Sequence, residues 1–512
     1  MTDTDVRSPL SASAATMLSG APAPRKIPRV LSPQALARAS EPTAKPISPI
    51  VLAGTVRMVE FAIVVAIGML IYAAYLPAEL GLLWRYLGAT LAIAALATLA
   101  FQTADIYQVQ AFRGYEKQYM RLASAWSVVF LLVIGISFFA KAGELFSRVW
   151  LGTFYLAGLA ALVSSRNVLF YLVRHWTRQG RLTRRTVIVG GGDPGAHVIE
   201  ELRRQKDIGV EIIGLFDDRG ERTGPETAGE RKLGTVDDLV EFGRRTRVDL
   251  VVFSLPISAE NRILQMLKKL WVLPVDIRLA AHSNKLQFRP RSYSYIGEVP
   301  VLDVADRPIA DWDVVMKWLF DKTIGGLALL FALPVMAAVA LAIKLDSKGP
   351  VLFKQKRYGF NNDLIEVYKF RSMYVDQTDA AAAKLVTKDD PRVTRVGRFI
   401  RKTSLDELPQ LFNVVLKGDL SLVGPRPHAI SAKAESRLYD EAVDGYFARH
   451  RVKPGITGWA QINGWRGETD TQEKIQKRVE HDLYYIENWS ALFDLTILVK
   501  TPFALLKTEN AY

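Results

Sequence analysis

Charged residues are absent from four long runs in the first third of the chain. The runs cover residues 61–78, 86–104, 122–140 and 149–165, and each is close to the roughly 20 apolar residues that a transmembrane helix needs. Lysine or arginine stands near the ends of the runs, where a long basic side chain reaches the lipid headgroups. Buried core helices of a soluble protein explain four successive runs poorly. The pattern predicts a bundle of four transmembrane helices within residues 51–175.

Lysine and arginine are distributed unequally between the two sides of this predicted bundle. Three lie on one side, at Arg85, Lys141 and Arg148. Eleven lie on the other side, at Lys45, Arg57, Arg113, Lys117, Arg121, Arg166, Arg174, Arg178, Arg181, Arg184 and Arg185. Basic loops stay on the cytoplasmic side of a membrane. We therefore expect the N-terminus and everything after Arg166 to be cytoplasmic, with the bundle acting as an anchor.

The first fifty residues show no such pattern. Residues 1–50 are rich in Ser, Ala and Pro and contain no sustained apolar run. They have neither the apolar stretch of a signal peptide nor the periodicity of a packed element. We expect a disordered tail.

From Thr186 the pattern becomes that of a soluble α/β domain over residues 186–300. The stretch TVIVGGGDPGAHVIEELRR is typical of a strand, a glycine turn and a helix, as in dinucleotide-binding folds. The matching positions are Gly190, Gly192 and Gly195 in the turn, and Asp217 or Asp218 after the next strand. The chain contains no Tyr-x-x-x-Lys pair, so a reductase or epimerase would lack its base. A domain that only folds, dimerises or senses a ligand is the favoured interpretation.

A fifth uncharged run, residues 323–343, is interrupted by Pro334, which breaks or kinks a helix. Basic residues flank both ends: Lys317 and Lys322 before it, and Lys344, Lys348, Lys354, Lys356 and Arg357 after it. A simple crossing would export one of these basic flanks. A re-entrant helix that enters and leaves on the cytoplasmic face avoids this conflict, and a kinked crossing is the alternative.

The last third of the chain combines basic residues with a pair of acids. In VYKFRSM, strand alternation places Lys369 and Arg371 on one face. Arginines then recur every third residue, at Arg392, Arg395, Arg398 and Arg401. They precede the adjacent acids Asp406 and Glu407. Arg426 follows between two prolines, and its planar guanidinium suits a pair of phosphate oxygens.

Two structural interpretations compete with a phosphate site here. Ser404-x-x-Glu407 before an apolar run also fits a capping box, in which Glu407 only satisfies a backbone N–H group. The arginine stripe could rest on lipid headgroups. Phosphoryl transfer and these structural roles therefore stay open at this point.

Composition narrows the class of protein. The 512 residues carry a formal net charge of +14 and no cysteine, and the mean hydropathy is +0.10. The missing cysteines exclude disulfide scaffolds, cysteine nucleophiles, zinc ribbons and iron–sulfur clusters. Positive charge on an apolar chain favours an anionic membrane surface or phosphorylated substrates over nucleic acid.

Four stretches carry a resemblance to a known family. They are KFRSM, DPRVTRVGRFIRKTSLDELPQLFNVVLKGDLSLVGPRP, KPGITGWAQINGWRGETDT and HDLYYIENWSALFDLTIL. Residues 310–512 resemble the catalytic module of the bacterial polyprenyl-phosphate hexose-1-phosphate transferases, and the whole chain resembles their large members. The stretch WRGETDT is similar to the undecaprenyl-phosphate glucose phosphotransferase branch. The resemblance implies transfer of a phosphosugar from a UDP-sugar to undecaprenyl phosphate with release of UMP, the first step of exopolysaccharide or capsule assembly.

The resemblance also implies roles for individual residues. Asp406 would be the nucleophile that forms a covalent phosphosugar intermediate, and Glu407 would act with it and with Mg²⁺ on the diphosphate. The implied phosphate-binding residues are Lys369, Arg371, Arg401 and Arg426. The implied nucleotide or sugar pocket contains Thr457, Gly458, Gln461 and Asp482, although Asp482 also fits a helix-surface charge. His428 fits a loop residue better than a general base.

The expected architecture is a membrane α-helical bundle, a Rossmann-like α/β domain and a mainly α catalytic domain with a re-entrant membrane helix at 314–344, kinked at Pro334. The resemblance implies the bacterial inner membrane, with the catalytic domain on the cytoplasmic face in contact with membrane lipid, and a homodimer. We expect no nucleic-acid partner. UDP-galactose is an alternative donor, and the alternative functions are a membrane NDP-sugar-modifying Rossmann enzyme and a non-enzymatic scaffold or nucleotide sensor.

Overall fold

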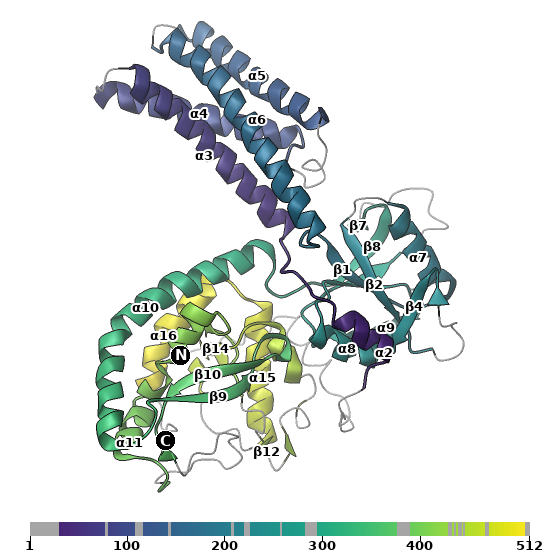
Figure 1. Cartoon of the computed structure of the whole chain (residues 1–512), viewed down its shortest axis with the longest axis vertical. Helices are drawn as coiled ribbons and strands as arrows, with labels where there is room; N and C mark the ends of the chain where they lie inside the picture. Colours follow the sequence, from purple (N-terminus) through teal and green to yellow (C-terminus); the bar gives the residue numbers. More distant parts are fainter. Residues whose placement is uncertain are drawn as a thin grey trace, which may run out of the picture. The chain divides into compact units, whose positions relative to one another are not determined.

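The chain forms two compact units in the computed structural model (Figure 1). One unit is Pro42–Arg184, and the other combines the segment before Pro42 with Arg185–Tyr512. The structure describes residues 30–76, 80–107, 116–141, 145–205, 209–219, 226–256, 259–281, 294–375, 390–428, 433–434, 437–438, 443, 446–465 and 471–506. Residues 1–29 of the predicted tail lie outside the described residues.

Four long helices make up the first unit. They are α3 (Pro49–Tyr75), α4 (Leu80–Thr103), α5 (Glu116–Phe139) and α6 (Arg148–Arg178). Their core is aromatic, with Trp126, Trp150 and Phe154 fully buried. Each tryptophan N–H donates to a backbone carbonyl, Trp150 to Gly68 at 3.0 Å and Trp126 to Tyr155 at 3.0 Å. Such bonds satisfy the one polar group of a buried tryptophan.

An ion pair that the sequence analysis did not anticipate joins α3 to α6. Glu60 and Arg166 lie 2.7 Å apart, with side chains only 3% and 1% exposed. The guanidinium groups of Arg57 and Arg166 both lie over the ring of Tyr107. The apolar runs begin just after Glu60 and end just before Arg166, so run boundaries alone place both residues outside the bundle. Their separation of 106 positions gives no local signal for the pair.

A sheet of eight strands forms the Rossmann-like part of the second unit. Its order is β3-β4-β2-β1-β5-β6-β8-β7. The strands are β1 (Arg184–Val189), β2 (Val210–Phe216), β3 (Glu226–Thr227), β4 (Glu230–Gly234), β5 (Leu250–Phe253), β6 (Asp276–Ala280), β7 (Ser294–Ile296) and β8 (Val299–Ala305). Parallel pairing joins β1 to β5, β5 to β6 and β2 to β4, whereas β8 pairs antiparallel with β6 and β7. The parallel centre confirms the expected α/β class.

Helices cover both faces of this sheet. Buried residues of α7 (Gly192–Arg204) form one apolar cluster with β1, β2 and β5. The opposite cluster contains α8 (Val236–Arg245) and α9 (Glu260–Leu270). The sheet is therefore buried on both sides, which explains its nearly continuous Val, Ile and Leu runs.

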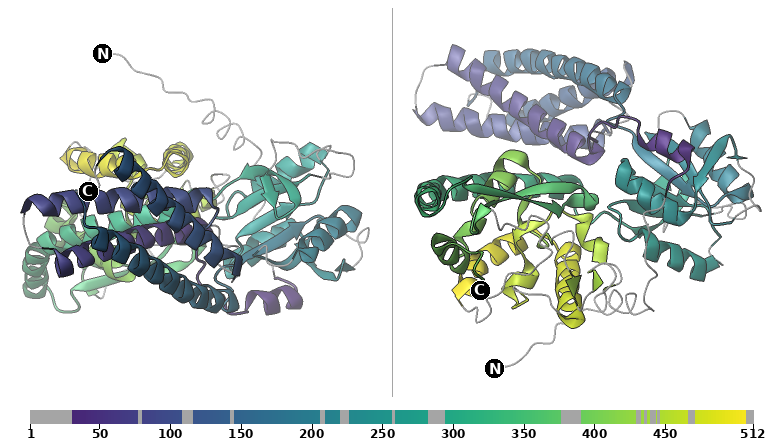
Figure 2. Two further views of the ribbon diagram at one scale, coloured as in Figure 1. Left: turned by 90° about the horizontal axis from the view of Figure 1, so that it is seen from above. Right: turned by 60° about the horizontal axis from the view of Figure 1, so that its bottom comes forward.

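The structure differs from the predicted tail over residues 30–50. A short helix, α2 (Pro33–Ala39), packs beside α8 and β4 (Figures 1 and 2). Leu31 and Ala35 are buried in the same cluster as α8 and α9. Ser32 caps the helix by accepting from the N–H of Ala35 and donates to the carbonyl of Leu233 at 2.9 Å. Seven residues are too few for a periodic signal, so this helix depends on the surface that it covers.

The remainder of the second unit is mainly helical around small sheets. Its helices are α10 (Asp311–Asp346), α11 (Arg395–Lys402), α12 (Gln410–Phe412), α14 (Trp459–Ile462), α15 (Gln472–Glu487) and α16 (Ala491–Leu506). Shorter helical turns are η3 (Phe360–Asn362), η5 (Leu405–Glu407), η6 (Asn413–Lys417) and η7 (Tyr446–Arg451). The strands are β9 (Leu352–Tyr358) paired with β10 (Leu364–Phe370), β11 (Ser421–Val423) paired with β14 (Gly455–Thr457), and β12 (Lys433–Ala434) paired with β13 (Arg437–Leu438).

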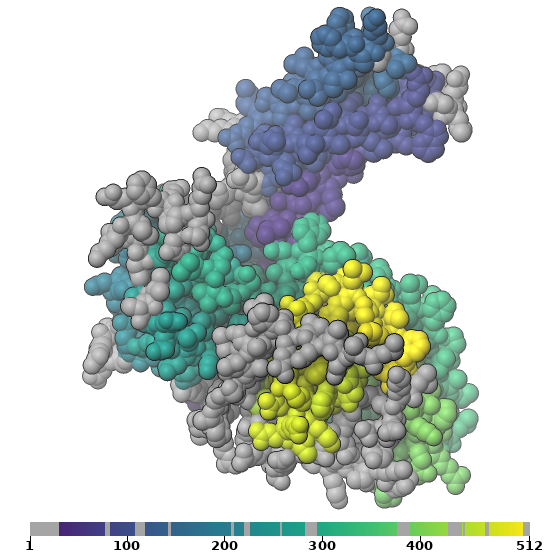
Figure 3. Space-filling view, turned by 180° about the vertical axis from the view of Figure 1, so that it is seen from behind, coloured from purple at the N-terminus to yellow at the C-terminus, as the bar shows by residue number. Residues whose placement is uncertain are grey.

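Both ends of α10 are bonded to this helical part. Near its start, the ammonium of Lys317 donates to the carbonyl of Val423 at 2.9 Å and lies 2.5 Å from Asp494. Just after its end, Arg371 donates to the carbonyls of Ser347 and Lys348 at 2.8 and 2.7 Å. The helix bends between these two attachments, and α16 lies at the surface beside it (Figures 1 and 3).

The middle of α10 shows large apolar side chains on its surface. The helix continues through Pro334. Exposed apolar residues along it include Leu327, Leu330, Phe331, Leu333, Val335, Leu341 and Leu345. Together with α3, α4, α5 and α6, α10 makes five described helices that are long and apolar enough to cross a membrane.

The packing of α2 gives a stability prediction. We expect Ala35→Glu to lower the free energy of unfolding of the Rossmann-like part by about 3 kcal/mol, because it places an unpaired carboxylate in a buried cluster. Calorimetry of the full chain in lipid nanodiscs would measure the loss. The matched control is Leu36→Glu, since Leu36 is 37% exposed on the same helix. Equal effects of the two substitutions would contradict the packing.

Candidate functional site

The acids Asp406 and Glu407 lie on the single turn η5, directly after α11. The turn starts from Ser404, which holds a left-handed conformation with φ of 58°. A non-glycine residue in this region is uncommon and marks a backbone held by its surroundings. The Ser404 side chain makes no capping bond to this turn. The capping-box interpretation of Ser404 and Glu407 is therefore wrong.

Glu407 instead binds two cations from distant parts of the chain. Lys369 at the end of β10 donates to Oε1 at 2.8 Å. Arg426 donates to Oε1 at 2.5 Å and to Oε2 at 3.3 Å. Burial alone would raise the pKa of Glu407, but the charges and hydrogen bonds of Arg426 and Lys369 outweigh it and lower that pKa well below its ordinary value. Glu407 is thus a fixed anion.

Asp406 has the opposite environment. It accepts no hydrogen bond from any residue that the structure describes, and its side chain is only partly buried. Burial raises the pKa of Asp406, Lys369 opposes that rise, and the neighbouring negative charge of Glu407 adds to it. The charges of Arg401 and Arg426 also oppose the rise, but the pKa of Asp406 still lies above its ordinary value. The two adjacent acids therefore differ: one is held, and the other is available to react.

Asn413 explains how β10 comes to lie beside η5. This residue is fully buried on η6. Its side-chain oxygen accepts from the N–H of Tyr368 at 2.9 Å, and its side-chain nitrogen donates to the carbonyl of Glu366 at 2.7 Å. An amide that bonds a strand edge in this way fixes the strand, and so it places Lys369 against Glu407. Sequence reasoning missed Asn413 because nothing local distinguishes it from a helix residue.

A cavity of about 210 Å³ opens beside Glu407 and Arg426. Its lining residues are Ser404, Glu407, Leu408, Leu411, Arg426, Ile456, Thr457, Gln461, Ile462, Thr501 and Ala504. The structure therefore brings the predicted pocket residues Thr457 and Gln461 together with the acidic turn. The side-chain oxygen of Gln461 is buried and has no hydrogen-bond partner among the described residues, so it can accept from a ligand.

Gly458 follows Thr457 in the chain but is not among the residues that line this cavity. A Cβ atom there would lie 2.3 Å from the carbonyl oxygen of Gly424, far inside van der Waals contact. The glycine therefore allows β14 to run against the segment that leads to Arg426. The structure therefore gives Gly458 a packing role, whereas the sequence predicted it in the pocket.

The structure does not bring Arg371 to the acids. Its guanidinium is buried at the end of α10, where it donates to Ser347 and Lys348. A Cβ atom at Gly349 would lie 2.1 Å from this guanidinium, so the arginine fits into a glycine turn. Strand alternation correctly puts Lys369 and Arg371 on one side, but it does not show what each side chain reaches.

The arginine stripe also divides into different roles. Arg392 is paired with Asp390 at 2.6 Å. Arg395 and Arg398 are exposed on α11. Only Arg401 acts on Asp406, whose pKa its charge lowers. The stripe is therefore not a single phosphate-binding surface.

Asp482 belongs to a buried ionic cluster that contacts the backbone of Arg426. It pairs with Arg449 at 2.6 Å, and both side chains are almost completely buried. Arg449 also donates to the carbonyl of Arg426 at 2.7 Å. These contacts place Asp482 in support of the Pro-Arg-Pro loop, whereas the sequence suggested a contact to metal or sugar, or a charge on a helix surface.

His428 belongs to the same cluster. Its Nδ1 atom lies 2.7 Å from the hydroxyl of Tyr446 and 2.6 Å from Arg449. Burial lowers the pKa of His428 well below its ordinary value, and the charges of Arg449 and Arg478 lower it further. A neutral, enclosed imidazole among donors serves as a hydrogen-bond acceptor in this cluster.

In the Rossmann-like part, the glycine turn makes several of its polar and packing contacts with its own residues and with Asp217. Gly190 and Gly192 have φ values of 104° and 75°, and a Cβ atom at Gly195 would lie 2.4 Å from the carbonyl oxygen of Gly190. The glycines thus serve the turn and its packing. Asp217, one of the two acids matched after the second strand, accepts from the N–H of Gly191 at 2.7 Å and pairs with Arg219 at 2.9 Å.

The acidic turn fits a magnesium ion better than a softer metal. Among the described residues there is no group of three or more His, Cys, Asp or Glu that could hold a metal. Magnesium commonly uses one or two carboxylates together with substrate phosphates and water. Asp406, with no hydrogen bond from a described residue, and the adjacent Glu407 match that donor set.

The turn thus combines a fixed anion, a carboxylate without a described hydrogen bond and nearby cations, which are the kinds of group that phosphoryl transfer uses. Comparison with known proteins agrees. A family described as bacterial sugar transferase matches residues 312–508, and one described as a CoA-binding domain matches residues 102–281. The chain is 34% identical over 468 residues to the UDP-glucose:undecaprenyl-phosphate glucose-1-phosphate transferase of Xanthomonas campestris pv. campestris, covering 89% of this chain and 94% of that protein.

Two further relatives show the same similarity. A transferase of the same name from Escherichia coli (strain K12) is 35% identical over 431 residues, which is 82% of this chain and 90% of the relative. The undecaprenyl-phosphate glucose phosphotransferase of Komagataeibacter xylinus is 40% identical over 355 residues, 69% of this chain and 65% of the relative. The chain belongs to the bacterial sugar transferases, as its motifs indicate.

The buried pair behind Arg426 gives a second prediction. We expect Arg449→Met to lower the free energy of unfolding by about 3–5 kcal/mol, because it leaves Asp482 buried without its partner. Thermal unfolding of the full chain in nanodiscs would report the change. Lys477→Met is the control, since Lys477 forms an exposed pair with Glu480 at 2.9 Å that should contribute less than about 1 kcal/mol. A loss no larger than that of the control would refute the supporting role.

Proposed function

We propose that this protein transfers glucose-1-phosphate from UDP-glucose to undecaprenyl phosphate, releases UMP and so starts exopolysaccharide or capsule synthesis. The observation that carries the proposal is the contrast between the held Glu407 and the available Asp406 on one turn. The names of the relatives support glucose as the sugar and undecaprenyl phosphate as the acceptor. UDP-galactose remains the alternative donor, to be tested beside UDP-glucose.

The chemistry follows from the environment of Asp406. A carboxylate oxygen of Asp406 attacks the β-phosphorus of UDP-glucose, and the phosphorus–oxygen bond to UMP breaks as the new bond forms. UMP leaves with the bonding electron pair. An oxygen of undecaprenyl phosphate then attacks the same phosphorus. The bond to Asp406 breaks, which restores the carboxylate and gives undecaprenyl-diphosphate-glucose.

The cationic side chains around Asp406 would bind the negatively charged phosphate groups of the substrates. Arg426 and Lys369 both bond Glu407 and lie close enough to Asp406 to lower its pKa. This proximity supports our assignment of both cations to phosphate oxygens. Arg401 adds a third positive charge. Asp406 and Glu407 would hold Mg²⁺ together with the diphosphate, and the ion would supply charge neutralisation there.

The cavity beside Glu407 suits the nucleotide or sugar. Its wall is largely apolar, and Gln461 presents a buried oxygen with no described partner. A site with few, directed polar groups in an apolar wall is typical of small-molecule recognition. We assign Thr457 and Gln461 to this role.

The membrane arrangement is part of the proposal. We assign α3, α4, α5 and α6 as spans of the bacterial inner membrane, with the catalytic part on the cytoplasmic face. We assign α10 as re-entrant, because Lys317 near its start and Ser347 at its end are both bonded to the catalytic part while the apolar residues between them are exposed. A helix that crossed the bilayer would separate these attachments by roughly 30 Å of lipid. The homodimer rests on the resemblance to the large members of the family.

The nucleophile assignment is tested by Asp406→Asn. We expect wild-type protein in nanodiscs with Mg²⁺ to release UMP from UDP-glucose over many turnovers only when undecaprenyl phosphate is present, and at most one equivalent per site without it. The variant should lose at least about 1,000-fold in turnover, because an amide oxygen is a poor nucleophile. Intact-protein mass spectrometry should detect glucose phosphate on the wild type without acceptor. Asp363→Asn, which changes an exposed carboxylate after η3, is the control. Full UMP release by Asp406→Asn would remove the transferase mechanism.

The pH dependence is tested by Lys369→Met. Asp406 must be ionised to attack, so the rate should rise with pH through its pKa, which lies above the ordinary aspartate value. Lys369 lowers that pKa, and its removal should therefore move the acid limb of the profile to higher pH. Lys402→Met, an exposed cation on α11, should leave the limb in place. An unchanged or lower-pH limb in Lys369→Met would contradict the electrostatic argument.

A further inference from the structure

The strands of the Rossmann-like part end together at one edge of the sheet. Gly190 N–H donates to Phe216 at 2.9 Å, and Asp217 N–H donates to Gly234 at 3.0 Å, so the ends of β1, β2 and β4 are adjacent. Ser254 N–H donates to Val189 at 2.9 Å and adds the end of β5. In open α/β sheets, ligands bind at this carboxyl edge, where the order of the strands reverses. Here the reversal lies between β1 and β5.

The glycine turn at this edge is unsuited to the usual dinucleotide mode. The carboxylate of Asp217 already bonds Gly191 and Arg219. The guanidinium of Arg219 also donates to the carbonyl of Gly191 at 2.8 Å, so it lies against the turn. A ligand of this edge therefore needs other groups.

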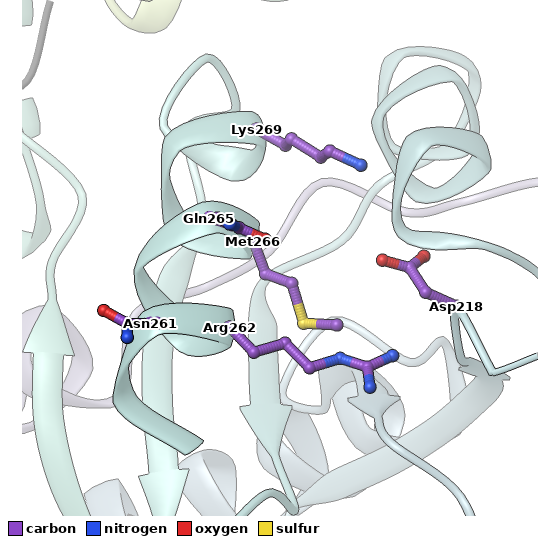
Figure 4. A pocket seen from close by; sticks show the side chains of 6 residues that line it. All are labelled: Asp218, Asn261, Arg262, Gln265, Met266 and Lys269. Carbon is purple, nitrogen blue, oxygen red and sulfur yellow. The ribbon is translucent and has the colours of Figure 1, made fainter.

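A separate cavity of about 420 Å³ lies at the same edge (Figure 4). Its lining residues are Asp218, Asn261, Arg262, Gln265, Met266 and Lys269. All except Asp218 belong to α9, and their spacing of three and four positions puts them along one side of the helix. Arg262, Met266 and Lys269 extend from α9 toward Asp218, which follows β2 on the opposite wall (Figure 4).

The polar groups of this cavity are available for a ligand. The side chains of Asn261, Arg262 and Gln265 make no hydrogen bond or ion pair with any residue that the structure describes. Lys269 lies 3.0 Å from Asp237 and adds a second positive charge. Asp218 accepts from the N–H of Val236 through one oxygen only. The other oxygen remains able to accept.

We propose that this cavity binds a nucleoside phosphate. Arg262 and Lys269 would hold the phosphate, since a guanidinium fork suits phosphate oxygens. Asp218 would accept from the ribose hydroxyls, as an acid after the second strand does in nucleotide-binding sheets. The volume is within the range of small-molecule sites and exceeds what inorganic phosphate fills. The site is independent of the transferase chemistry and leaves the glycine turn closed.

Hydrogen exchange measured by mass spectrometry on the full chain in nanodiscs tests this site. ADP, UDP and CoA at millimolar concentration distinguish the sources of the nucleotide, and pyrophosphate tests the anion alone. We expect at least one nucleotide to slow exchange in peptides from residues 259–270. Arg262→Ala should weaken binding by roughly tenfold or more, because it removes a charge-assisted hydrogen bond, and Gln265→Ala should weaken it less.

The control is Arg245→Ala, which removes an exposed arginine of α8 outside the cavity. It should leave the protection of α9 intact, and Arg262→Ala should leave basal UMP release unchanged. Hydrogen exchange in peptides from residues 404–408 measures binding at the proposed catalytic site separately. A failure of the proposed transferase function can therefore be distinguished from a failure of nucleotide binding at α9. The proposal is overturned if no nucleotide slows exchange in α9, if Arg262→Ala does not reduce the effect, or if pyrophosphate alone reproduces it.

Discussion

The site depends on one interaction, the binding of the Glu407 carboxylate by Arg426 and Lys369. It joins three segments that are far apart in the sequence: the end of β10, the turn η5 and the loop between two prolines. It also gives two neighbouring acids different environments, because Arg426 and Lys369 bond Glu407 whereas Asp406 accepts no hydrogen bond from a described residue. A symmetric arrangement would hold both carboxylates equally and leave neither poised to attack phosphorus. The proposed mechanism follows from this asymmetry.

Buried charged residues bond the segments that carry Arg426. Arg449 holds the backbone of Arg426 and is itself neutralised by Asp482. Lys317 of α10 bonds the carbonyl of Val423, three residues before Arg426. The same short strand, β11, therefore connects the apolar helix to the catalytic loop. The proposed reaction joins a water-soluble nucleotide to a lipid phosphate, so its charged groups need a fixed height relative to the membrane. In the proposed re-entrant arrangement, the buried pair of Lys317 and Asp494 near the start of α10 would supply that fixed attachment.

The sequence predicts the parts of this site that depend on adjacency. Asp406 and Glu407 are neighbours, Arg426 is held between prolines, and Thr457 and Gln461 follow a short strand, so local pattern and family resemblance place them together. The predictions fail or stay incomplete where the contact depends on how far, and in which direction, a side chain extends. Alternation cannot show that Arg371 turns to the end of α10, and no local pattern shows that Asp482 faces Arg449. The helix α2 and the pair of Glu60 and Arg166 were missed for the same reason, since both depend on surfaces contributed by distant segments.

The Rossmann-like part shows the converse case, in which a motif is present but its usual chemistry is not. Gly190, Gly192 and Gly195 match the dinucleotide pattern and adopt the backbone that the pattern requires. The acid that would bind ribose, Asp217, is nevertheless consumed by the turn and by Arg219. A glycine pattern indicates where two backbone segments approach closely. Ligand binding depends instead on which polar groups have no partner within the protein. By that criterion the proposed ligand surface lies on α9 and not at the turn, because the Arg262 side chain has no described partner. The motif identifies the edge of the sheet, and the side chains without described partners identify the part of that edge to which we assign the ligand.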